Sequence, residues 1–513
     1  MSLFDKRRRR ILTFLVLVTS GCTPNHDYDA KNAASYTPNP IEINAQISSA
    51  LKTLEVVPSV SVSLYTRNGS YSNTFGVLDV DTQEAARLSS SFYIASSTKS
   101  MVAVAMAILH ERGEIDLDAT LSQFAPNANF PADVLPHQVT LRHLLAQMSG
   151  LMNVPIQTRL AYTGQHSPEL LWSLLSETKV NKAKPLGTFA YTNYNFNILT
   201  MLVEDKLNKS WKDILADEIF TPLGMTNTSA YLPTAESVNW SLAKPHTTLG
   251  KNGPSRLYLE KSDATMQSAG GVNMSAKDAL KWLELVIEEG KVGEQQIVPQ
   301  DAILGTLQEQ VKVDSEFGDY QRHHYGLGWY LGSYKGQPFV HHFGGFVGTR
   351  AHVSFMPQSK VGVAVFVNGN GVGDKFADVI ANYLYALVHE PEQAIVQYDN
   401  DVGALVQWRD KTQQQVIANA KKRNQRTWQL SFPKSSYTGK FINRLYGEFT
   451  VSIIDEEIRF NIGNLSARAT PYPEQDTMRI ELVPGSGRVI EYSLDTNNDI
   501  TSFIYDGNIF RRN

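Results

Sequence analysis

The sequence predicts an α+β protein, in which an antiparallel sheet is flanked by helices and joined by a helical subdomain, followed by a small all-β domain. Alternating apolar and polar residues near the start, at Val60, Val62 and Leu64, indicate a half-buried strand, and similar patterns return only after residue 338. Residues 139–290 have mostly helical spacing. A sheet built from both ends of the domain would therefore enclose a helical insert.

Composition narrows the classes of function. The chain has 513 residues, of which 42% are hydrophobic and 19% charged, the balance of a globular protein with more than one core. Lys and Arg number 47 against 51 Asp and Glu, so the chain lacks the basic excess expected of a nucleic-acid-binding protein. Cys22 is the only cysteine, which excludes an intramolecular disulfide and a zinc–thiolate site.

The N-terminus has the pattern of an export signal. The basic run Lys6–Arg10 precedes the apolar run Ile11–Val18, which is too short to span a membrane and matches the core of a secretory signal. It ends in Ser20-Gly21-Cys22, which resembles a bacterial lipoprotein signal with a lipidated cysteine. We expect a signal peptide over residues 1–22, a polar tether over 23–44, and a periplasmic protein that is lipid-anchored to the membrane. Plain secretion is the alternative.

Residues 45–388 are predicted to form the main domain, with strands at both ends and helices between them. The expected helices cover residues 41–54, 101–109, 167–178, 195–206, 211–220, 276–289 and 376–388. The expected strands cover residues 60–65, 74–80, 339–342, 350–356 and 361–367.

Two further units are predicted after the main domain. Residues 389–435 are polar and Gln-rich, with helical character over 404–423, and we interpret them as a helical linker. Residues 436–513 contain short alternating segments, which predict an all-β domain large enough for its own core. These segments are 447–454, 457–461, 478–482, 490–494 and 500–505.

The sequence Ser96-Ser97-Thr98-Lys99 is the first candidate for catalysis. Residues i and i+3 share a helix face, so the Ser96 hydroxyl and the Lys99 amine can meet, and a desolvated lysine can remove the proton of a serine nucleophile. The spacing alone is weak evidence, because SxxK also begins at Ser49, Ser176, Ser241 and Ser431. Only Ser96 follows an apolar strand-like segment and opens a long apolar helix.

Two further elements are equally weak in isolation. In Tyr191-Thr192-Asn193 the phenol can move protons and the amide can orient a carbonyl or a lysine, but YxN recurs at Tyr71 and Tyr398. His342-Phe343-Gly344 has a rival in His324-Tyr325-Gly326, and most histidines in such patterns are structural.

The order of these elements resembles the serine β-lactamase and penicillin-binding-protein superfamily, in particular the class C β-lactamase-like hydrolases. The matching motifs, in order, are FYIASSTK (92–99), VTLRHLLAQMSGL (139–151), GTFAYTNYNFNIL (187–199), IFTPLGM (219–225), SAGGV (268–272), YGLGWY (325–330) and HHFGGFVG (341–348). The segment from Tyr437, YTGKFINRLYGEFTV, resembles the lipocalin-like C-terminal domain of some of these hydrolases. The resemblance implies a DD-peptidase/β-lactamase-like fold with the active site between sheet and helical subdomain.

The resemblance implies a role for each matching residue of the first two motifs. Ser96 matches the nucleophile, Lys99 its proton partner, and Tyr191 the general base or proton relay. Asn193 matches the amide that orients the substrate. No metal or organic cofactor is implied.

The third motif carries the expectations for substrate binding. His342 stands where β-lactamases carry the lysine of their KTG strand, Gly344 permits close backbone approach, and the N–H groups of Ser96 and Gly345 would form the oxyanion hole. Phe343 replaces a Thr or Ser whose hydroxyl helps to hold a substrate carboxylate, and we expect its ring to border the acyl pocket. This departure favours esters, amides or D-aminoacyl substrates over β-lactams.

The expected function is therefore an exported serine hydrolase that acts through an acyl-enzyme on a small-molecule or peptide substrate, without a nucleic-acid partner. The alternative is a non-hydrolytic, penicillin-recognising or peptidoglycan-docking lipoprotein whose β domain supplies the function. Both hypotheses include a tether to the membrane through Cys22.

Replacing Cys22 tests the anchor. Cys22→Ser removes the thiol that would carry the lipid, so the protein should become soluble without detergent or remain unprocessed. Thr23 stands where Asp would favour retention in the inner membrane, so fractionation of the parent should place it in the outer membrane. Unmodified mature parent protein free in the periplasm would contradict the prediction.

Overall fold

A ten-stranded antiparallel sheet organises the main domain of the computed structural model, which describes residues 33, 35–233, 240–495 and 499–513. The strand order is β12-β13-β14-β15-β17-β18-β1-β2-β3, with β16 paired to β17. The strands are β1 (Ser59–Thr66), β2 (Gly69–Asp79), β3 (Glu84–Ala85), β12 (Val311–Phe317), β13 (Tyr320–Tyr325), β14 (Tyr330–Tyr334), β15 (Gln337–His341), β16 (Gly344–Phe346), β17 (Thr349–Met356) and β18 (Val361–Val367). In the centre Val60 of β1 lies opposite Val367 of β18, which confirms a sheet made from both ends of the domain.

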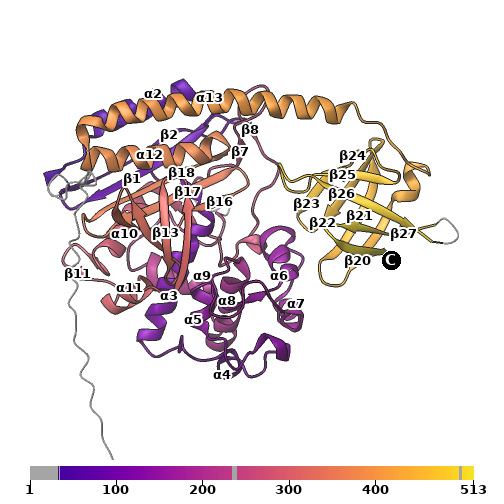
Figure 1. Ribbon diagram of the computed structural model, residues 1–513, viewed down its shortest axis with the longest axis horizontal. Helices are drawn as coiled ribbons and strands as arrows, with labels where there is room; N and C mark the ends of the chain where they lie inside the picture. The colour runs from indigo at the N-terminus through magenta and orange to yellow at the C-terminus, as the bar shows by residue number, and fades with distance from the viewer. Residues whose placement is uncertain (1–32, 34, 234–239, 496–498) are drawn as a thin grey trace, which may run out of the picture.

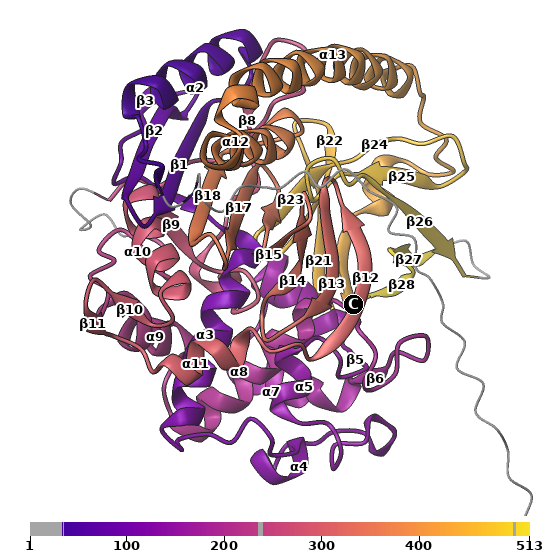
Figure 2. The same ribbon diagram turned by 60° about the vertical axis from the view of Figure 1, so that its left-hand side comes forward.

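Helices cover both faces of this sheet (Figures 1 and 2). On one face lie α2 (Pro40–Leu54), α12 (Val372–His389) and α13 (Pro391–Asn424), which share one buried apolar cluster with the strands. On the other face lie α3 (Thr98–Glu111), α10 (Ala276–Ile287) and α11 (Gln300–Thr306). The helical subdomain extends this second layer with α4 (Leu121–Phe124), α5 (Leu141–Leu145), α6 (Val154–Thr158), α7 (Pro168–Ser173), α8 (Asn193–Leu207) and α9 (Trp211–Leu215).

One short pairing joins two distant segments next to the central strands β17 and β18. β4 (Ser91–Tyr93) pairs with β9 (Asn273–Ser275), immediately before α3 and α10. Ser275 caps α10 by accepting a hydrogen bond from the Asp278 amide. Because the pairing is antiparallel, α3 and α10 start from opposite ends of this short ladder.

The boundaries of the predicted tether and linker differ from the structure. Helix α2 starts at Pro40, and Ile43 is fully buried, so residues 40–44 belong to the main domain rather than to the tether. The predicted linker, 389–435, is mostly the single helix α13, whose first half packs on α12 and α2 through Tyr398 and Val402. Its polar composition concealed this buried stripe. The predicted signal, tether start and Cys22 lie outside the described residues.

Five strands of the main sheet were not predicted, the short strands β3 and β16 and the consecutive strands β12, β13 and β14. β12, β13 and β14 lie at its outer end, and β12 is largely exposed, with charged residues such as Lys312 and Glu316. A strand at the edge of a sheet needs little apolar surface, so the alternation that reveals a buried strand is weak there.

The C-terminal strands form a separate nine-stranded sheet that curls almost into a barrel. Its order is β23-β22-β21-β20-β28-β27-β26-β25-β24, and its two ends are neighbours in the chain. The strands are β20 (Gly439–Asn443), β21 (Gly447–Ile454), β22 (Glu457–Ile462), β23 (Leu465–Arg468), β24 (Thr470–Pro471), β25 (Thr477–Ile480), β26 (Arg488–Leu494), β27 (Ile500–Tyr505) and β28 (Asn508–Arg512). Phenylalanine rings fill the interior, with Phe441 and Phe503 4.8 Å apart between ring centres.

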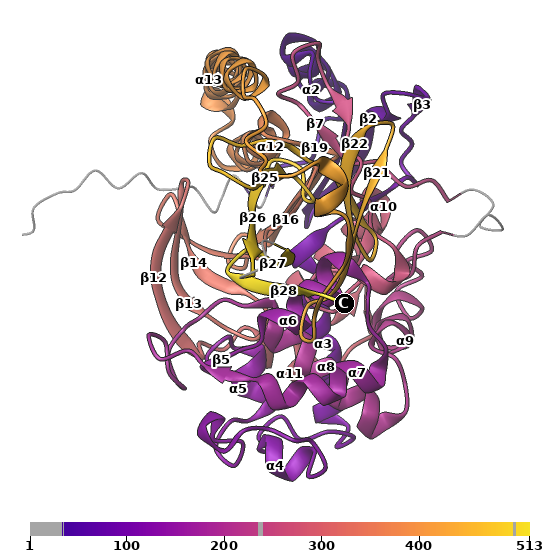
Figure 3. The ribbon, with the colours of Figure 1, turned by 90° about the vertical axis from the view of Figure 1, so that its right-hand side faces the viewer.

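Helix α13 spans from the main domain to this β domain, which also contacts the helical subdomain (Figures 1 and 3). The Arg159 side chain donates to the Leu445 carbonyl at 2.8 Å, and the Asn464 amide donates to the Thr163 carbonyl at 2.8 Å. A Cβ on Gly463 would overlap that same carbonyl. Within the described ranges, no helix combines the length and apolar composition needed to cross a membrane.

Candidate active site

Ser96 lies in a strained turn between strand β4 and helix α3. Ala95 has a φ of 46°, a left-handed conformation that costs a non-glycine residue roughly 1–2 kcal/mol. The surrounding backbone is packed tightly, because a Cβ on Gly344 would overlap the carbonyl oxygen of Ile94. Backbone strain maintained by such packing is a common feature of functional turns. The turn presents the Ser96 hydroxyl at the junction of the sheet and the helical subdomain.

Lys99 is completely buried one helical turn after Ser96. Its Nζ donates to three oxygens: Ser96 Oγ at 3.1 Å, Asn193 Oδ1 at 2.8 Å and the Ala269 carbonyl at 2.6 Å. Burial lowers the pKa of Lys99 well below its ordinary value of 10.5, because no carboxylate compensates the desolvated charge. In the neutral form two N–H bonds can remain on Asn193 and Ala269, which leaves the lone pair to accept the Ser96 proton.

Tyr191 stands beside this lysine. Nζ of Lys99 lies 4.9 Å from the centre of the Tyr191 ring. Although 40% of the residue's surface is exposed, its hydroxyl end is enclosed, and burial raises the pKa of Tyr191. The Tyr330 hydroxyl adds to this rise, and an interaction with Ser96 offsets only part of it. Tyr191 therefore keeps its proton at neutral pH, whereas the pKa of Lys99 is shifted toward the neutral form.

A buried glutamine fixes the loop that carries Tyr191 and Asn193. Gln147 Oε1 accepts hydrogen bonds from the Thr192 amide at 3.0 Å and from Asn195 Nδ2 at 2.9 Å. Thr192 in turn caps α8 by accepting from the Tyr194 amide. Asn193 is thus the first residue of α8, with its side chain on Lys99. Sequence reasoning did not identify Gln147, although it lies in the motif VTLRHLLAQMSGL.

His342 faces the same site from the sheet and is neutral. Its Nδ1 lies 3.0 Å from the Phe343 carbonyl, so Nδ1 must carry the proton and Nε2 the lone pair. Nε2 is buried without a hydrogen-bond partner. Burial, followed by the nearby Lys99 charge, lowers the pKa of His342 well below 6.5. The ring centre is 6.0 Å from that of Tyr191, which leaves an unused acceptor beside the phenol.

The nucleophile turn and the His342 strand are bonded together. The Ser97 hydroxyl donates to the His342 carbonyl at 2.7 Å. Gly344 lies against the backbone of the turn, while the Cβ position of Gly345 points into open space. A substrate carbonyl can therefore approach the Gly345 backbone next to the start of the helix, where unpaired N–H groups concentrate.

The structure corrects the expectation for Phe343. Its ring lies in the cluster on the opposite face of the sheet, 4.0 Å from the His341 ring and 4.4 Å from the His352 ring between centres. Successive residues of a strand point to opposite faces, so His342 and Phe343 cannot both face the site. Phe343 is a core residue and does not border the acyl pocket.

An aromatic wall around His342 was also missed. Tyr330 stacks on Tyr191 with 6.4 Å between ring centres, and Tyr325 lies 6.1 Å from His342. The guanidinium carbon of Arg322 lies 3.9 Å from the centre of the Tyr330 ring. Both tyrosines belong to the motif YGLGWY, which was the available signal, but nothing in the sequence pointed to Arg322.

The competing motif copies lie elsewhere, and four of them have ordinary partners. Ser241 bonds to Ser90, Ser431 to Asp476, Tyr71 to Asn44, and His324 pairs with Glu309. One group in the described chain has a metal-ligand arrangement, His110 with Asp116 and Asp118. It is mainly exposed, Asp118 is engaged by Arg142, and none of its members belongs to the site around Ser96.

Comparisons with known sequences agree with this arrangement. The family described as Beta-lactamase matches residues 47–387. Penicillin-binding protein 4 of Amycolatopsis lactamdurans is 26% identical over 349 residues, which cover 67% of this chain and 90% of that protein. Protein flp of Staphylococcus aureus is 21% identical over 322 residues, which cover 61% of this chain and 60% of that protein.

Solved structures show the same fold. An octameric penicillin-binding protein homologue from Pyrococcus abyssi superimposes with a TM-score of 0.56 at 20% identity, over 91% of this chain and 99% of that one. A D-amino acid amidase from Ochrobactrum anthropi SV3, complexed with L-phenylalanine amide, has a TM-score of 0.54 at 19% identity, over 70% of this chain and 99% of that one.

Replacing Phe343 separates a packing role from a substrate role. Phe343→Thr removes a buried ring from the cluster with His341 and His352, so the free energy of unfolding should fall by about 3 kcal/mol, as for comparable large-to-small changes. The ratio of nitrocefin to p-nitrophenyl acetate turnover should stay unchanged, because the ring does not face the site. Denaturant titration and the two assays provide the measurements. A tenfold shift of the ratio at unchanged stability would contradict this placement.

Proposed function

Since this chain belongs to the β-lactamase family of serine hydrolases, we propose that it hydrolyses ester, amide or D-aminoacyl bonds through an acyl-enzyme on Ser96. The hydrogen bond between Lys99 Nζ and Ser96 Oγ carries this proposal. It joins a nucleophile to a base whose pKa is lowered by burial. The fold of a D-amino acid amidase over 70% of this chain supports the choice of amide and D-aminoacyl substrates.

Acylation is assigned to Lys99 as base and Ser96 as nucleophile. Neutral Lys99 takes the Ser96 proton as Oγ attacks the substrate carbonyl, and the resulting oxyanion is stabilised by the N–H groups of Ser96 and Gly345. Asn193 holds the amine of Lys99 in line during this transfer, since its Oδ1 accepts from Nζ at 2.8 Å. The raised pKa of Tyr191 excludes a phenolate base at neutral pH.

Tyr191 is assigned as the acid that protonates the leaving group. It carries the proton that this step needs, and protonated Lys99, 4.9 Å from its ring, can restore that proton afterwards. Nε2 of His342 has no other hydrogen-bond partner and can accept from the Tyr191 hydroxyl. This contact orients the hydroxyl, and His342 stays neutral throughout. Water then hydrolyses the acyl-enzyme and releases the product acid.

Export with a lipid anchor at Cys22 completes the proposed function. It rests on the basic run, the apolar run and the single cysteine of the N-terminus. The main domain starts at α2, so the residues between Cys22 and Pro40 would form the tether between anchor and enzyme.

Covalent labelling tests the nucleophile. Ser96→Ala should lose all labelling by a fluorophosphonate and all turnover, because among the described residues no other serine has a lysine amine on its hydroxyl. Ser176→Ala is the matched control: it alters another SxxK copy, whose hydroxyl bonds to the Ser173 carbonyl, and should label like the parent. Peptide mapping identifies the modified residue. Label on any serine other than Ser96 would refute the assignment.

A substrate panel separates hydrolysis from recognition alone. Nitrocefin, p-nitrophenyl esters, D-amino-acid amides and a D-Ala-D-Ala peptide should divide into turned-over and inert compounds, with esters or D-aminoacyl amides turned over. Stoichiometric labelling of Ser96 by fluorescent penicillin with no turnover of any panel member would favour the non-hydrolytic alternative.

The pH dependence of kcat/KM tests the division of roles. The base acts when deprotonated, so kcat/KM for p-nitrophenyl acetate should rise with pH as Lys99 loses its proton and reach a plateau well below 10.5, the ordinary pKa of lysine. His342 is already neutral above its lowered pKa. His342→Gln should therefore reduce the plateau without moving the midpoint of the rise. A midpoint that shifts or disappears in this variant would assign the rise to His342.

A further inference from the structure

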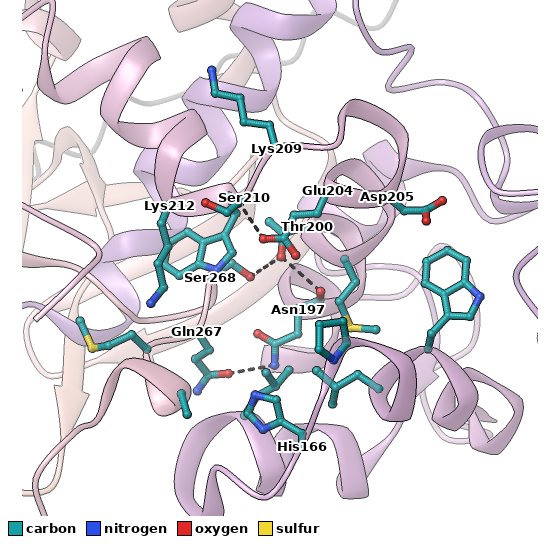
Figure 4. Close-up of a pocket in the computed structure, with 18 of the residues that line it drawn as sticks. His166, Asn197, Thr200, Glu204, Asp205, Lys209, Ser210, Lys212, Gln267 and Ser268 are labelled. Carbon is teal, nitrogen blue, oxygen red and sulfur yellow. Dashed lines mark hydrogen bonds between the residues drawn. The ribbon is translucent and has the colours of Figure 1, made fainter.

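A large cavity lies in the helical subdomain, separate from the site around Ser96 (Figure 4). Its volume is about 900 Å³, within the range of pockets that hold small ligands. The walls come from α7, from the side of α8 that runs from Asn197 to Asn208, from the start of α9 and from residues 263–268. None of Ser96, Lys99, Tyr191 and His342 lines it.

The floor of the cavity offers two buried polar atoms without a hydrogen bond, one on an amide and one on an imidazole. Asn197 Nδ2 donates to Gln267 Oε1 at 2.8 Å, as Figure 4 shows. Asn197 is only 1% exposed, yet its Oδ1 has no partner, and His166 Nδ1 is also buried without one. A buried acceptor without a hydrogen bond is costly. A donor on a ligand would remove that cost.

The walls above this floor are apolar and aromatic. Leu171, Trp172, Met201 and Met266 line them, and Trp211 closes the end near α9. Burying an aliphatic or aromatic side chain against such a surface is favourable, because it removes apolar area from water. The combination of an amide-binding floor with apolar walls is the chemistry that recognises peptides.

A carboxylate near the outer end, Glu204, is compensated only by the more distant charge of Lys212, which offsets part of the effect of its burial. Glu204 Oε1 accepts a hydrogen bond from the Trp211 amide at 2.8 Å, and no ion pair within the described ranges involves Glu204. The two lysines of the cavity are already engaged, Lys209 by Asp217 and Lys212 by Asp263. Burial raises the pKa of Glu204, so an ammonium group placed there would restore its ionised form.

We propose that this cavity binds the amino-terminal end of a short peptide. The ammonium group pairs with Glu204, apolar side chains lie on Trp172 and Met201, and a backbone amide bonds to Asn197 and Gln267. Asn197 and Glu204 are seven residues apart on α8, which is roughly 10 Å at 1.5 Å per residue. An extended peptide covers that distance with about three residues.

Direct binding measurements use Ser96→Ala as the parent, so that a probe amide is not turned over. Trileucine amide should bind saturably to one site, measured by calorimetry and by the fluorescence of Trp172 and Trp211. N-acetyl-trileucine amide lacks the ammonium group and should bind at least tenfold more weakly. Equal binding of both probes, or no binding of trileucine amide, would overturn the proposal.

Variants locate the site. Glu204→Gln retains an oxygen for the Trp211 amide but loses the charge, so the affinity for trileucine amide should fall at least tenfold. Glu392→Gln, an exposed glutamate at the start of α13, is the charge-matched control and should bind like the parent. Met201→Trp fills the cavity and should also abolish binding, with unchanged thermal unfolding showing that the fold persists.

A blocked active site separates this cavity from the centre that we propose for catalysis. Wild-type protein phosphonylated at Ser96 should bind trileucine amide with unchanged affinity. Loss of binding after phosphonylation would place the probe in the catalytic centre and refute the second site. If Ser96 cannot be labelled at all, the proposed function fails, while binding to the Ser96→Ala protein still tests the cavity by itself.

Discussion

Burial of the Lys99 amine among three oxygens is the interaction on which the rest of the site depends. Ser96 Oγ, Asn193 Oδ1 and the Ala269 carbonyl come from the nucleophile turn, the start of α8 and the segment before β9. The three segments meet because the helical subdomain packs against α3 in the layer on one face of the main sheet. Burying an ammonium group without a carboxylate is unfavourable, and the same lack of compensation gives lysine a pKa suited to a base.

Tyr191 and His342, the titratable neighbours of Lys99, are also uncharged at neutral pH. Burial raises the pKa of Tyr191 and lowers that of His342, so both are neutral around the lysine. Burial is therefore the main cause of all three pKa shifts, and each shift favours the uncharged form of its group. As Ser96 attacks and Lys99 takes its proton, negative charge develops on the substrate oxygen, where the oxyanion hole and the start of α3 can stabilise it. Phe343, the apparent departure from the family pattern, stabilises the opposite face of the sheet instead.

Much of this arrangement could be predicted from the sequence, where its physical signals are local. Strands β1, β17 and β18 are buried and alternate or are apolar throughout, so their ranges agree with the structure within a few residues. Ser96 and Lys99 were distinguished from four other SxxK copies by the apolar strand before them and the apolar helix after them. The family was inferred from seven motifs that occur in the order typical of it, because the spacing within any single motif is too common to identify a family.

The remaining features depend on tertiary contacts that no local pattern encodes. Lys99 donates to the backbone carbonyl of Ala269, and any residue carries such a carbonyl, so the amino-acid type at this position gives no sign of the contact. Helix α13 carries its buried residues on a narrow stripe within a polar segment, which concealed its packing on α12 and α2. The side chains of successive strand residues point to opposite faces, so alternation places the Phe343 ring on the face opposite to His342. The prediction from the motif considered only the position of Phe343 in the sequence and therefore placed its ring in the acyl pocket.

The most direct test of the central claim is the pKa of Lys99 itself. NMR of protein carrying carbon-13 at the lysine Cε positions can follow each amine as a function of pH, and the Lys99 signal is assigned by its absence from Lys99→Met. We predict that this signal titrates well below 10.5, apart from the exposed lysines. A Lys99 signal that titrates together with the exposed lysines would contradict its role as the base.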